Sequence, residues 1–203
     1  MKGCRPFSDR ELDLVLGSFS GKMALRNRAL FLLGIRSGFR ISEMLSLRLG
    51  AVLQFGQVVE TVTLERRSTK GRIVGRTQVL HAAVRQALMA WIQEISHQRI
   101  LTSETPLFIS RSKPTSPISR FWVYTFLKRI YQANGMAGKL ATHSMRKTFA
   151  DRFYTGCGRD VRQTQIALGH KSLSSTGDYL SFRQEDVDRV ILAMGADGNQ
   201  VTK

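Results

Sequence analysis

Four short stretches of the chain carry side chains whose chemistry suits the transfer of a phosphoryl group. The stretches SGFRISEMLSL, STKGR, THSMRKTFA and LGHKSLSSTGDYL contain, in chain order, Arg40, Lys70, His143, Arg146, His170 and Tyr179. Two arginines offer paired donors to phosphate oxygens, a lysine can protonate a leaving alkoxide, and a histidine can exchange a proton with the attacking group. A tyrosine hydroxyl can be the nucleophile where neighbouring cations lower its pKa from about 10. Such a set would transfer a phosphoryl group without a metal ion.

Each of these residues also has an ordinary structural explanation. A tyrosine beside an apolar residue usually packs with its hydroxyl satisfied, and this applies to Tyr179. An arginine near a helix start, such as Arg40, and a lysine before a glycine in a hairpin, such as Lys70, are both common. The pair His143 and Arg146 can arise by chance in a basic chain. The order of all six residues, with their flanking sequence, is far more specific than any one of them.

Most of these residues are predicted to lie at the ends of helices, where their side chains are accessible. Arg40 follows a glycine-containing turn and precedes a helix, on which Glu43, three residues later, is near enough to brace it. His143 and Arg146 stand three apart at a helix start, so both project to one face. His170 lies just past the end of another helix.

The hydrophobic pattern predicts helices joined by one β-hairpin. Residues 57–65 and 73–80 are predicted strands, and the loop between them carries Lys70 at its tip. A capping box of Ser8 and Glu11 starts the first helix. Further helices are expected over residues 22–37, 41–49, 81–96, 119–132, 143–154 with Thr142 as N-cap, 162–169 ending on Gly169, and 184–194. The expected fold class is mainly α with a small antiparallel β-sheet (α+β), and residues 1–203 are expected to form a single domain.

The charge balance indicates a polyanionic partner. The 203 residues include 31 Lys and Arg but only 15 Asp and Glu, which gives a net charge of +16. Nucleic acid is the first candidate partner, and an anionic membrane surface is the alternative. Between Thr105 and Ala150 there is no acidic residue. The basic residues of this stretch and of the hairpin loop, expected to face phosphates, are Arg66, Arg67, Arg72, Arg76, Arg111, Lys113, Arg120, Lys128, Arg129, Lys139 and Lys147.

Several other classes of protein find no support in the sequence. No apolar run is long enough for a transmembrane helix, and the N-terminus has no apolar core of a secretory signal. Cys4 and Cys157 show no metal-ligand spacing and are expected to be free thiols in a reducing cytoplasm. No glycine-rich phosphate loop is present. We therefore expect no metal, no ATP and no other cofactor.

With these motifs in order, the chain resembles the catalytic domain of the tyrosine recombinases, the phage integrase family. GFRISEMLSLRL resembles that family's first arginine box, and TKGR its hairpin lysine. HSMRKTFA resembles the His-x-Leu-Arg box, with Met145 in place of the usual leucine and Lys147 where histidine or arginine is frequent. ALGHKSLSSTGDYL resembles the Leu-Gly-His box, with the nucleophile nine residues after its histidine. The resemblance runs from about Pro6 to the final helix and implies the tyrosine recombinase catalytic-domain fold.

The resemblance also implies a reaction and a role for each residue. Tyr179 would attack a DNA phosphodiester, forming a 3′-phosphotyrosyl bond and releasing a 5′-hydroxyl. Lys70 would protonate the leaving oxygen, and Arg40 and Arg146 would hold the non-bridging oxygens. His143 would handle the proton of the nucleophile, and His170 would hydrogen-bond a phosphate oxygen. Two rounds of exchange through a Holliday junction would make the chain a site-specific recombinase or integrase of double-stranded DNA.

The implied assembly is a homotetramer on DNA, with a monomer or weak oligomer in its absence, in a prokaryotic cytoplasm. Family members usually carry an N-terminal DNA-clamping domain, and we expect none within residues 1–203. The C-terminal segment 184–203 would pack in cis or dock on a neighbouring subunit. Two other functions are compatible with similar residues: relaxation of supercoils by a type IB topoisomerase, and a catalytically silent DNA-binding regulator.

Overall fold

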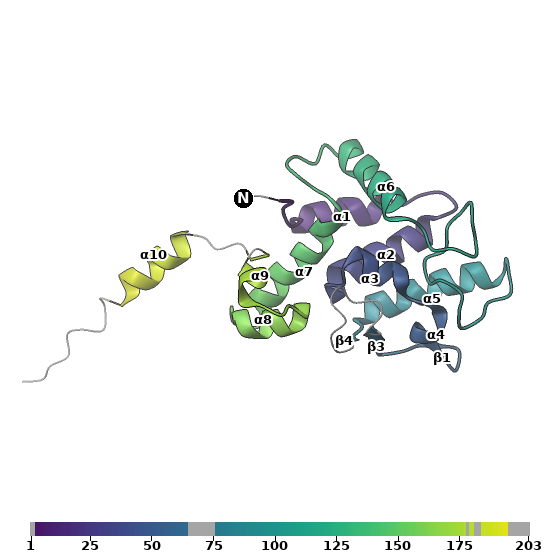
Figure 1. Ribbon diagram of the computed structural model, residues 1–203. Helices are drawn as coiled ribbons and strands as arrows, with labels where there is room; N and C mark the ends of the chain where they lie inside the picture. The colour runs from purple at the N-terminus through teal and green to yellow at the C-terminus, as the bar shows by residue number, and fades with distance from the viewer. Residues whose placement is uncertain (1–2, 65–75, 178, 181–183, 195–203) are drawn as a thin grey trace, which may run out of the picture.

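The computed structural model describes residues 3–64, 76–177, 179–180 and 184–194. Helices account for most of this chain, and the strands form two short antiparallel pairs (Figure 1). The helices are α1 (Asp9–Gly17), α2 (Ala24–Ser37), α3 (Ile41–Ser46), α4 (Leu49–Val52), α5 (Ala82–Ser96), α6 (Arg120–Ala133), α7 (Thr142–Gly156), α8 (Val161–Leu168), α9 (Leu173–Gly177) and α10 (Gln184–Ala193). The predicted class, mainly α with a small antiparallel sheet, is confirmed.

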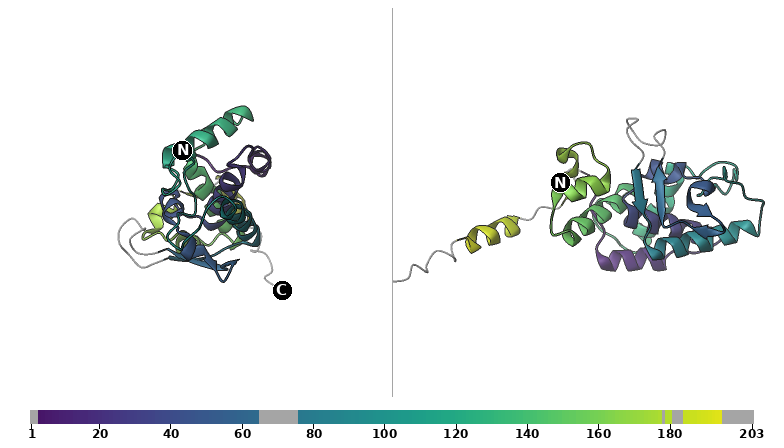
Figure 2. Two further views of the ribbon diagram at one scale, coloured as in Figure 1. Left: turned by 90° about the vertical axis from the view of Figure 1, so that its right-hand side faces the viewer. Right: turned by 90° about the horizontal axis from the view of Figure 1, so that it is seen from below.

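The predicted hairpin is present, but its first strand is interrupted. β1 (Leu53–Gln54) pairs with β2 (Gln57–Val58) across a tight turn, and β3 (Thr61–Leu64) pairs with β4 (Arg76–Val79). The single predicted strand over 57–65 is therefore divided between two sheets. Figure 2 shows β3 and β4 side by side along one edge of the helical body. Residues 65–75, which connect them and include Lys70, lie outside the described residues.

Local sequence explains most of the helix ends. Ser8 and Glu11 form the predicted capping box at α1, with the Glu11 carboxylate accepting from the Ser8 N–H at 2.9 Å. Ser119 caps α6 and Asp160 caps α8. The expected cap of α7 was wrong by one residue, because Ala141 occupies the N-cap and Thr142 is already helical. The predicted helix over 41–49 also ends early, at Ser46, and the short α9 was not predicted.

Helix α2 forms the centre of the main core. It packs against α5 and α7, and its residues Leu30 and Phe31 are fully buried. Gly34 allows α7 to approach closely, since a Cβ there would lie 2.7 Å from Sδ of Met145. A second, smaller cluster of buried side chains lies beside the end of α7 and is made by Phe149, Ala150, Leu168 and Leu180.

Helix α10 lies apart from the rest of the described molecule in Figure 1 and in the right-hand view of Figure 2. Its apolar side chains Ile191 and Leu192 are exposed, as is Met194 just beyond it. No helix of the described residues is both long enough and apolar enough to cross a membrane.

Candidate active site

Arg40 is held by a glutamate at the start of α3. Gly38, with φ of +62°, ends α2 in the left-handed conformation, and a Cβ at this position would overlap the ring of Phe149. The chain therefore turns sharply into Arg40, which is the N-cap of α3. The buried carboxylate of Glu43 accepts from both the backbone N–H and Nη1 of Arg40, each at 2.7 Å. This double contact confirms the predicted bracing and leaves the other donors of the partly exposed guanidinium available.

Arg146 lies in the first turns of α7 and is deeply buried, with 1% of its surface exposed. Its guanidinium donates to the carbonyl oxygens of Gly38 and Leu168, the latter at 2.8 Å. The Nε–H is buried and has no acceptor within the described structure. Burial and the nearby charge of Arg40 lower the pKa of Arg146 to about 10, so it remains a cation at neutral pH.

His170 is a neutral acceptor whose tautomer follows from its neighbours. Nη2 of Arg146 lies 2.8 Å from Nε2, and Oγ1 of Thr176 lies 3.0 Å from Nδ1. Because a guanidinium only donates, Nε2 accepts and Nδ1 carries the proton that is donated to Thr176. Burial, together with the charges of Arg146, Arg40 and Arg76, lowers the pKa of His170 to about 3.

Tyr179 is placed among these groups by the residues on either side of it. Its backbone N–H donates to the carbonyl oxygen of Thr176 at 2.9 Å, and Leu180 is buried in the smaller hydrophobic cluster. The phenol ring lies beside both imidazoles, with its centroid 4.9 Å from that of His143 and 4.9 Å from that of His170. It also covers Arg146, whose Cζ is 5.5 Å from the ring centroid.

The electrostatic character of this group is strongly positive. Three arginines lie close together here: Arg40, Arg76 and Arg146. Their charges lower the pKa of Arg76, Arg146 and His170, and the negative charge of Glu43 partly compensates this effect on Arg76 and Arg146. Burial and the charges of Arg146, Lys147 and Arg40 lower the pKa of His143. His143 is therefore neutral at pH 7 and has a nitrogen available to accept a proton. Such a site suits a phosphoryl group that gains negative charge during reaction.

The structure brings together five of the six predicted active-site residues, since Lys70 lies outside the described part of the chain. The same holds for the predicted DNA contacts Arg66, Arg67 and Arg72. Of the remaining residues expected to face phosphates, six are exposed: Arg111, Lys113, Arg120, Lys128, Arg129 and Lys139.

Two basic residues expected on the phosphate-facing surface are placed elsewhere. Lys147 is only 6% exposed, because residues 144–150 of α7 run between the two hydrophobic clusters and are buried on every side. Lys147 therefore does not lie on the exposed surface in this structure, and its contact with DNA stays a prediction. Arg76 turns inward and donates to carbonyl oxygens instead of facing solvent. Thr176, buried beside His170, was missed, and its only sequence signal was its position three residues before Tyr179.

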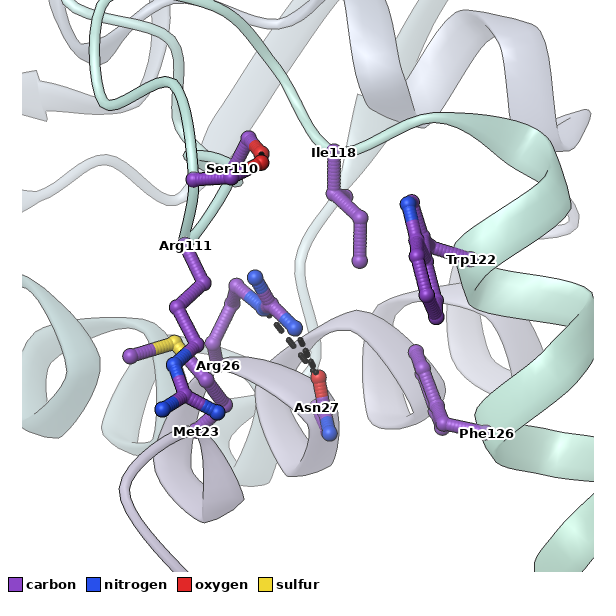
Figure 3. Close-up of a pocket in the computed structure, with 9 residues that line it drawn as sticks. Met23, Arg26, Asn27, Ser110, Arg111, Ile118, Trp122 and Phe126 are labelled. Carbon is purple, nitrogen blue, oxygen red and sulfur yellow. Dashed lines mark hydrogen bonds between the residues drawn. The ribbon is translucent and has the colours of Figure 1, made fainter.

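A separate cavity of about 410 Å³ lies between the start of α2, the loop before α6, and α6 itself. Figure 3 shows Arg26 in its wall, with Nε and Nη2 donating to Oδ1 of Asn27. None of the catalytic candidates lines this cavity. Among the described residues, no group of three or more His, Cys, Asp or Glu side chains is placed to hold a metal ion.

The fold is that of the tyrosine recombinase catalytic domain. The sequence model of the phage integrase family matches residues 11–185, and the chain belongs to that family. It is similar to tyrosine recombinase XerD of Corynebacterium glutamicum (30% identity, 82% of this chain and 51% of the relative). It is also similar to the probable integrase/recombinase YoeC of Bacillus subtilis (27% identity, 81% of each).

Solved structures show the same arrangement of elements. The crystal structure of XerH site-specific recombinase bound to a palindromic difH substrate, in a post-cleavage complex, matches with a TM-score of 0.74 and 25% identity, covering 94% of this chain and 53% of that one. XerA recombinase matches with a TM-score of 0.73 at 17% identity, covering 93% of this chain and 64% of that one. The chain spans about half the length of the XerC and XerD relatives it matches.

Proposed function

We propose that this chain is the catalytic domain of a site-specific DNA recombinase that cleaves and rejoins strands through a 3′-phosphotyrosyl intermediate. The observation that carries the proposal is the position of the Tyr179 ring, close to the imidazoles of both His143 and His170 and over the buried guanidinium of Arg146. A tyrosine that served only for packing would not need two imidazoles and a cation around its ring. Membership of the phage integrase family supports the same reaction.

The contacts within the site support a division of labour among its residues. Neutral His143, beside the phenol, would accept the proton of Tyr179 as the hydroxyl attacks phosphorus. Arg40 would bind a non-bridging oxygen with the donors that Glu43 leaves available, and Arg146 would bind another, with its unpartnered Nε–H as a candidate donor. Lys70 would protonate the departing 5′-oxygen. The bond energy is retained in the phosphotyrosyl ester, so the reverse attack by a 5′-hydroxyl restores the diester.

Double-stranded DNA is the proposed substrate, and exchange between two duplexes is the proposed outcome. The exposed cations Arg111, Lys113, Arg120, Lys128 and Arg129 support a phosphate-binding surface. Relatives named tyrosine recombinases favour strand exchange over the relaxation of supercoils by a topoisomerase. The set of five assembled active-site residues argues against a silent regulator, because a site without chemistry has no reason to retain them together. The activity would take place on DNA in a prokaryotic cytoplasm.

We also propose that the chain acts as a homotetramer on DNA, with the segment 184–203 docking on a neighbouring subunit. Support comes from α10, which lies apart from the body and exposes Ile191 and Leu192 (Figure 1). An isolated amphipathic helix of ten residues is marginal in water and gains stability when its apolar face is covered. Sedimentation of the chain with and without its DNA site would measure the change in oligomeric state.

The test is covalent capture of DNA. The chain is mixed with nicked duplexes whose arms carry randomised sequence, denatured in detergent, and the attached DNA is sequenced to find the cleaved site. The linked peptide should carry a phosphotyrosine at Tyr179. Tyr179→Phe should fold and bind the recovered site but form no adduct, while Tyr124→Phe should react normally. An adduct mapped to Tyr124, Tyr131 or Tyr154, or one that persists in Tyr179→Phe, would overturn the proposal.

A further inference from the structure

Arg76 makes more contacts with the walls of the active site than any catalytic candidate among the described residues. It opens β4, where it pairs with Leu64, and its side chain reaches across to two other segments. Nη1 donates to the carbonyl oxygens of Leu168 at 3.1 Å and Gly38 at 3.5 Å. Nη2 donates to the carbonyl oxygen of Ser37 at 2.9 Å and also to that of Ala167.

Two further contacts fix the plane of this guanidinium. Oε1 of Gln78, on the same strand, accepts from Nη2 at 2.8 Å. The Cζ atom lies 5.2 Å from the centroid of the Phe39 ring, within the range of a cation–π interaction. Gly169 leaves room for the side chain, since a Cβ there would lie 2.9 Å from Cδ of Arg76. The guanidinium therefore occupies a slot whose shape depends on the surrounding backbone.

The segments that Arg76 joins are those that carry catalytic candidates. Ser37 and Gly38 form the turn that leads into Arg40, and Ala167 and Leu168 end the helix that leads into His170. Arg146 donates to the same two carbonyl oxygens, of Gly38 and Leu168. Arg76 thus lies beside Arg146 and shares its acceptors. It also lies at the base of the hairpin whose loop contains Lys70.

We propose that Arg76 is a positioning residue of the active site, which clamps the turn before Arg40 and the end of α8 to the base of the Lys70 hairpin. The inference rests on the function proposed above. Arg76 itself would not contact the scissile phosphate, because its guanidinium is directed at backbone carbonyls. Its contribution would be to keep Arg40, Arg146 and His170 in a common geometry on three separate elements.

The chemistry of the contacts requires an arginine. A planar guanidinium can donate to several carbonyl oxygens in fixed directions, whereas a lysine ammonium is a single point that cannot span Ser37, Gly38, Ala167 and Leu168 together. Loosening such a clamp changes geometry at the reacting atoms, and a displacement of about 1 Å there is worth about a hundredfold in rate. Arg76→Ala and Arg76→Lys should therefore both slow cleavage, although the lysine keeps the charge.

The chain offers a matched control in Arg26. Arg26 is buried, with 5% of its surface exposed, whereas Arg76 is partly buried, and like Arg76 it donates to a backbone carbonyl oxygen, that of Ile109 at 2.8 Å. Burial lowers the pKa of both Arg26 and Arg76 to about 10. Arg26 lines the cavity of Figure 3 and contacts none of the catalytic candidates. Its removal should reproduce the loss of a buried guanidinium without disturbing the active site.

The experiment measures single-turnover adduct formation at saturating DNA, DNA affinity and thermal unfolding for the parent chain, Arg76→Ala, Arg76→Lys and Arg26→Ala. Well below the unfolding temperature, both Arg76 variants should bind DNA nearly normally and form adduct about a hundredfold more slowly. Arg26→Ala should unfold at a lower temperature and react at the parent rate. Guanidinium chloride, far below its denaturing range, should partly restore Arg76→Ala, and sodium chloride of the same ionic strength should not.

Three results would overturn the inference: a parent rate of adduct formation in Arg76→Ala, a parent rate in Arg76→Lys, or an equally slow rate in Arg26→Ala. A second readout does not need activity. Hydrogen exchange over residues 36–45 and 165–177 should accelerate in Arg76→Ala and not in Arg26→Ala, and unchanged protection would overturn the clamp by itself. If the parent chain forms no adduct, the proposed recombinase activity fails, and the exchange measurement alone then decides the role of Arg76.

Discussion

Nη2 of Arg146 lies 2.8 Å from Nε2 of His170, and this contact determines which nitrogen of the imidazole carries the proton. The family resemblance implies that His170 hydrogen-bonds a phosphate oxygen, which would require a proton on the nitrogen facing the phosphate. In this structure Nε2 accepts a hydrogen bond from Arg146, so His170 holds the guanidinium of Arg146 in place. The role toward phosphate would be taken up only if Arg146 turns away from His170 when DNA binds.

We predict that Thr176→Val weakens the site through His170. Valine has a similar shape but cannot accept the Nδ1–H, which would leave a buried donor unsatisfied at a cost of about 1–3 kcal/mol. If about 1.4 kcal/mol of that loss raises the barrier to cleavage, because His170 and Arg146 are held less firmly, adduct formation slows by about tenfold. Thr176→Ser keeps the acceptor and should react nearly as the parent does. Nitrogen chemical shifts of His170 would report the tautomer directly, and a proton found on Nε2 in the parent chain would contradict the assignment.

We predict that acid destabilises the fold through His170 before it does so through the carboxylates. The pKa of His170 is about 3 in the folded chain and about 6.5 when unfolded, so the unfolded chain binds more protons between these values. Stability is therefore full above about pH 6.5 and falls as the pH decreases toward 3, with a slope of at most about 1.4 kcal/mol per pH unit for one proton. Pairing with Arg5 lowers the pKa of Glu11 from 4.5 to about 2, so protonation of this carboxylate reduces stability only below about pH 4.5.

Urea unfolding between about pH 5 and 6.5 isolates the histidine contribution. His170→Asn should flatten the pH dependence in this window, whereas His97→Asn, at the exposed end of α5, should not. An equal slope in His170→Asn and in the parent would show that His170 is not held neutral by the fold.

We predict that Lys70 is the general acid of cleavage. Lys70→Ala should leave DNA affinity nearly intact and slow cleavage by about 10²–10⁴-fold, the usual worth of a positioned acid. A substrate with a bridging 5′-sulfur should restore most of the lost rate, because a thiolate leaves without protonation. The same substrate should do little for Arg40→Ala, whose role lies on the non-bridging oxygens. Rescue of Arg40→Ala and not of Lys70→Ala would mean that the two roles are reversed.

We predict that DNA affinity depends steeply on salt, because the chain carries a net charge of +16. Six or more phosphate contacts would lose roughly a thousandfold in affinity between about 50 and 200 mM salt. Removing one exposed cation, as in Arg120→Ala or Lys128→Ala, should reduce the logarithmic salt slope by about 0.9. Arg10→Ala, on α1, is the control and should leave the slope unchanged. Titrations at several salt concentrations measure this, and a nearly flat dependence would contradict a phosphate-dominated interface.

The elements of the site could be predicted from the sequence, because local patterns determine them. The glycine turn before Arg40, the helix that carries His143 and Arg146, and the pairing of β3 with β4 all follow from residue types within a few positions. The expected bracing of Arg40 by Glu43 was also confirmed, since both lie in one helical turn.

The burial of Lys147 and the inward turn of Arg76 could not be predicted in this way. Both residues belong to strongly basic stretches, where a solvated or DNA-facing position is the natural expectation. Their actual positions depend on tertiary packing: α7 passes between two hydrophobic clusters, and carbonyl oxygens of two distant segments converge on Arg76. Thr176 was missed for the same reason, because only the fold brings its hydroxyl to His170.

The small hydrophobic cluster beside Tyr179 is separate from the main core, so the position of the proposed nucleophile and the stability of the domain depend on different side chains. Leu180 anchors the tyrosine in that cluster, and a buried leucine is worth about 1.5–3 kcal/mol, while the main core rests on many such side chains. A substitution at Leu180 would therefore shift the fraction of molecules with a seated tyrosine and leave the rest of the chain folded. In evolutionary terms, the rate of the proposed reaction could then be adjusted at one position without weakening the main core that holds the other proposed catalytic residues.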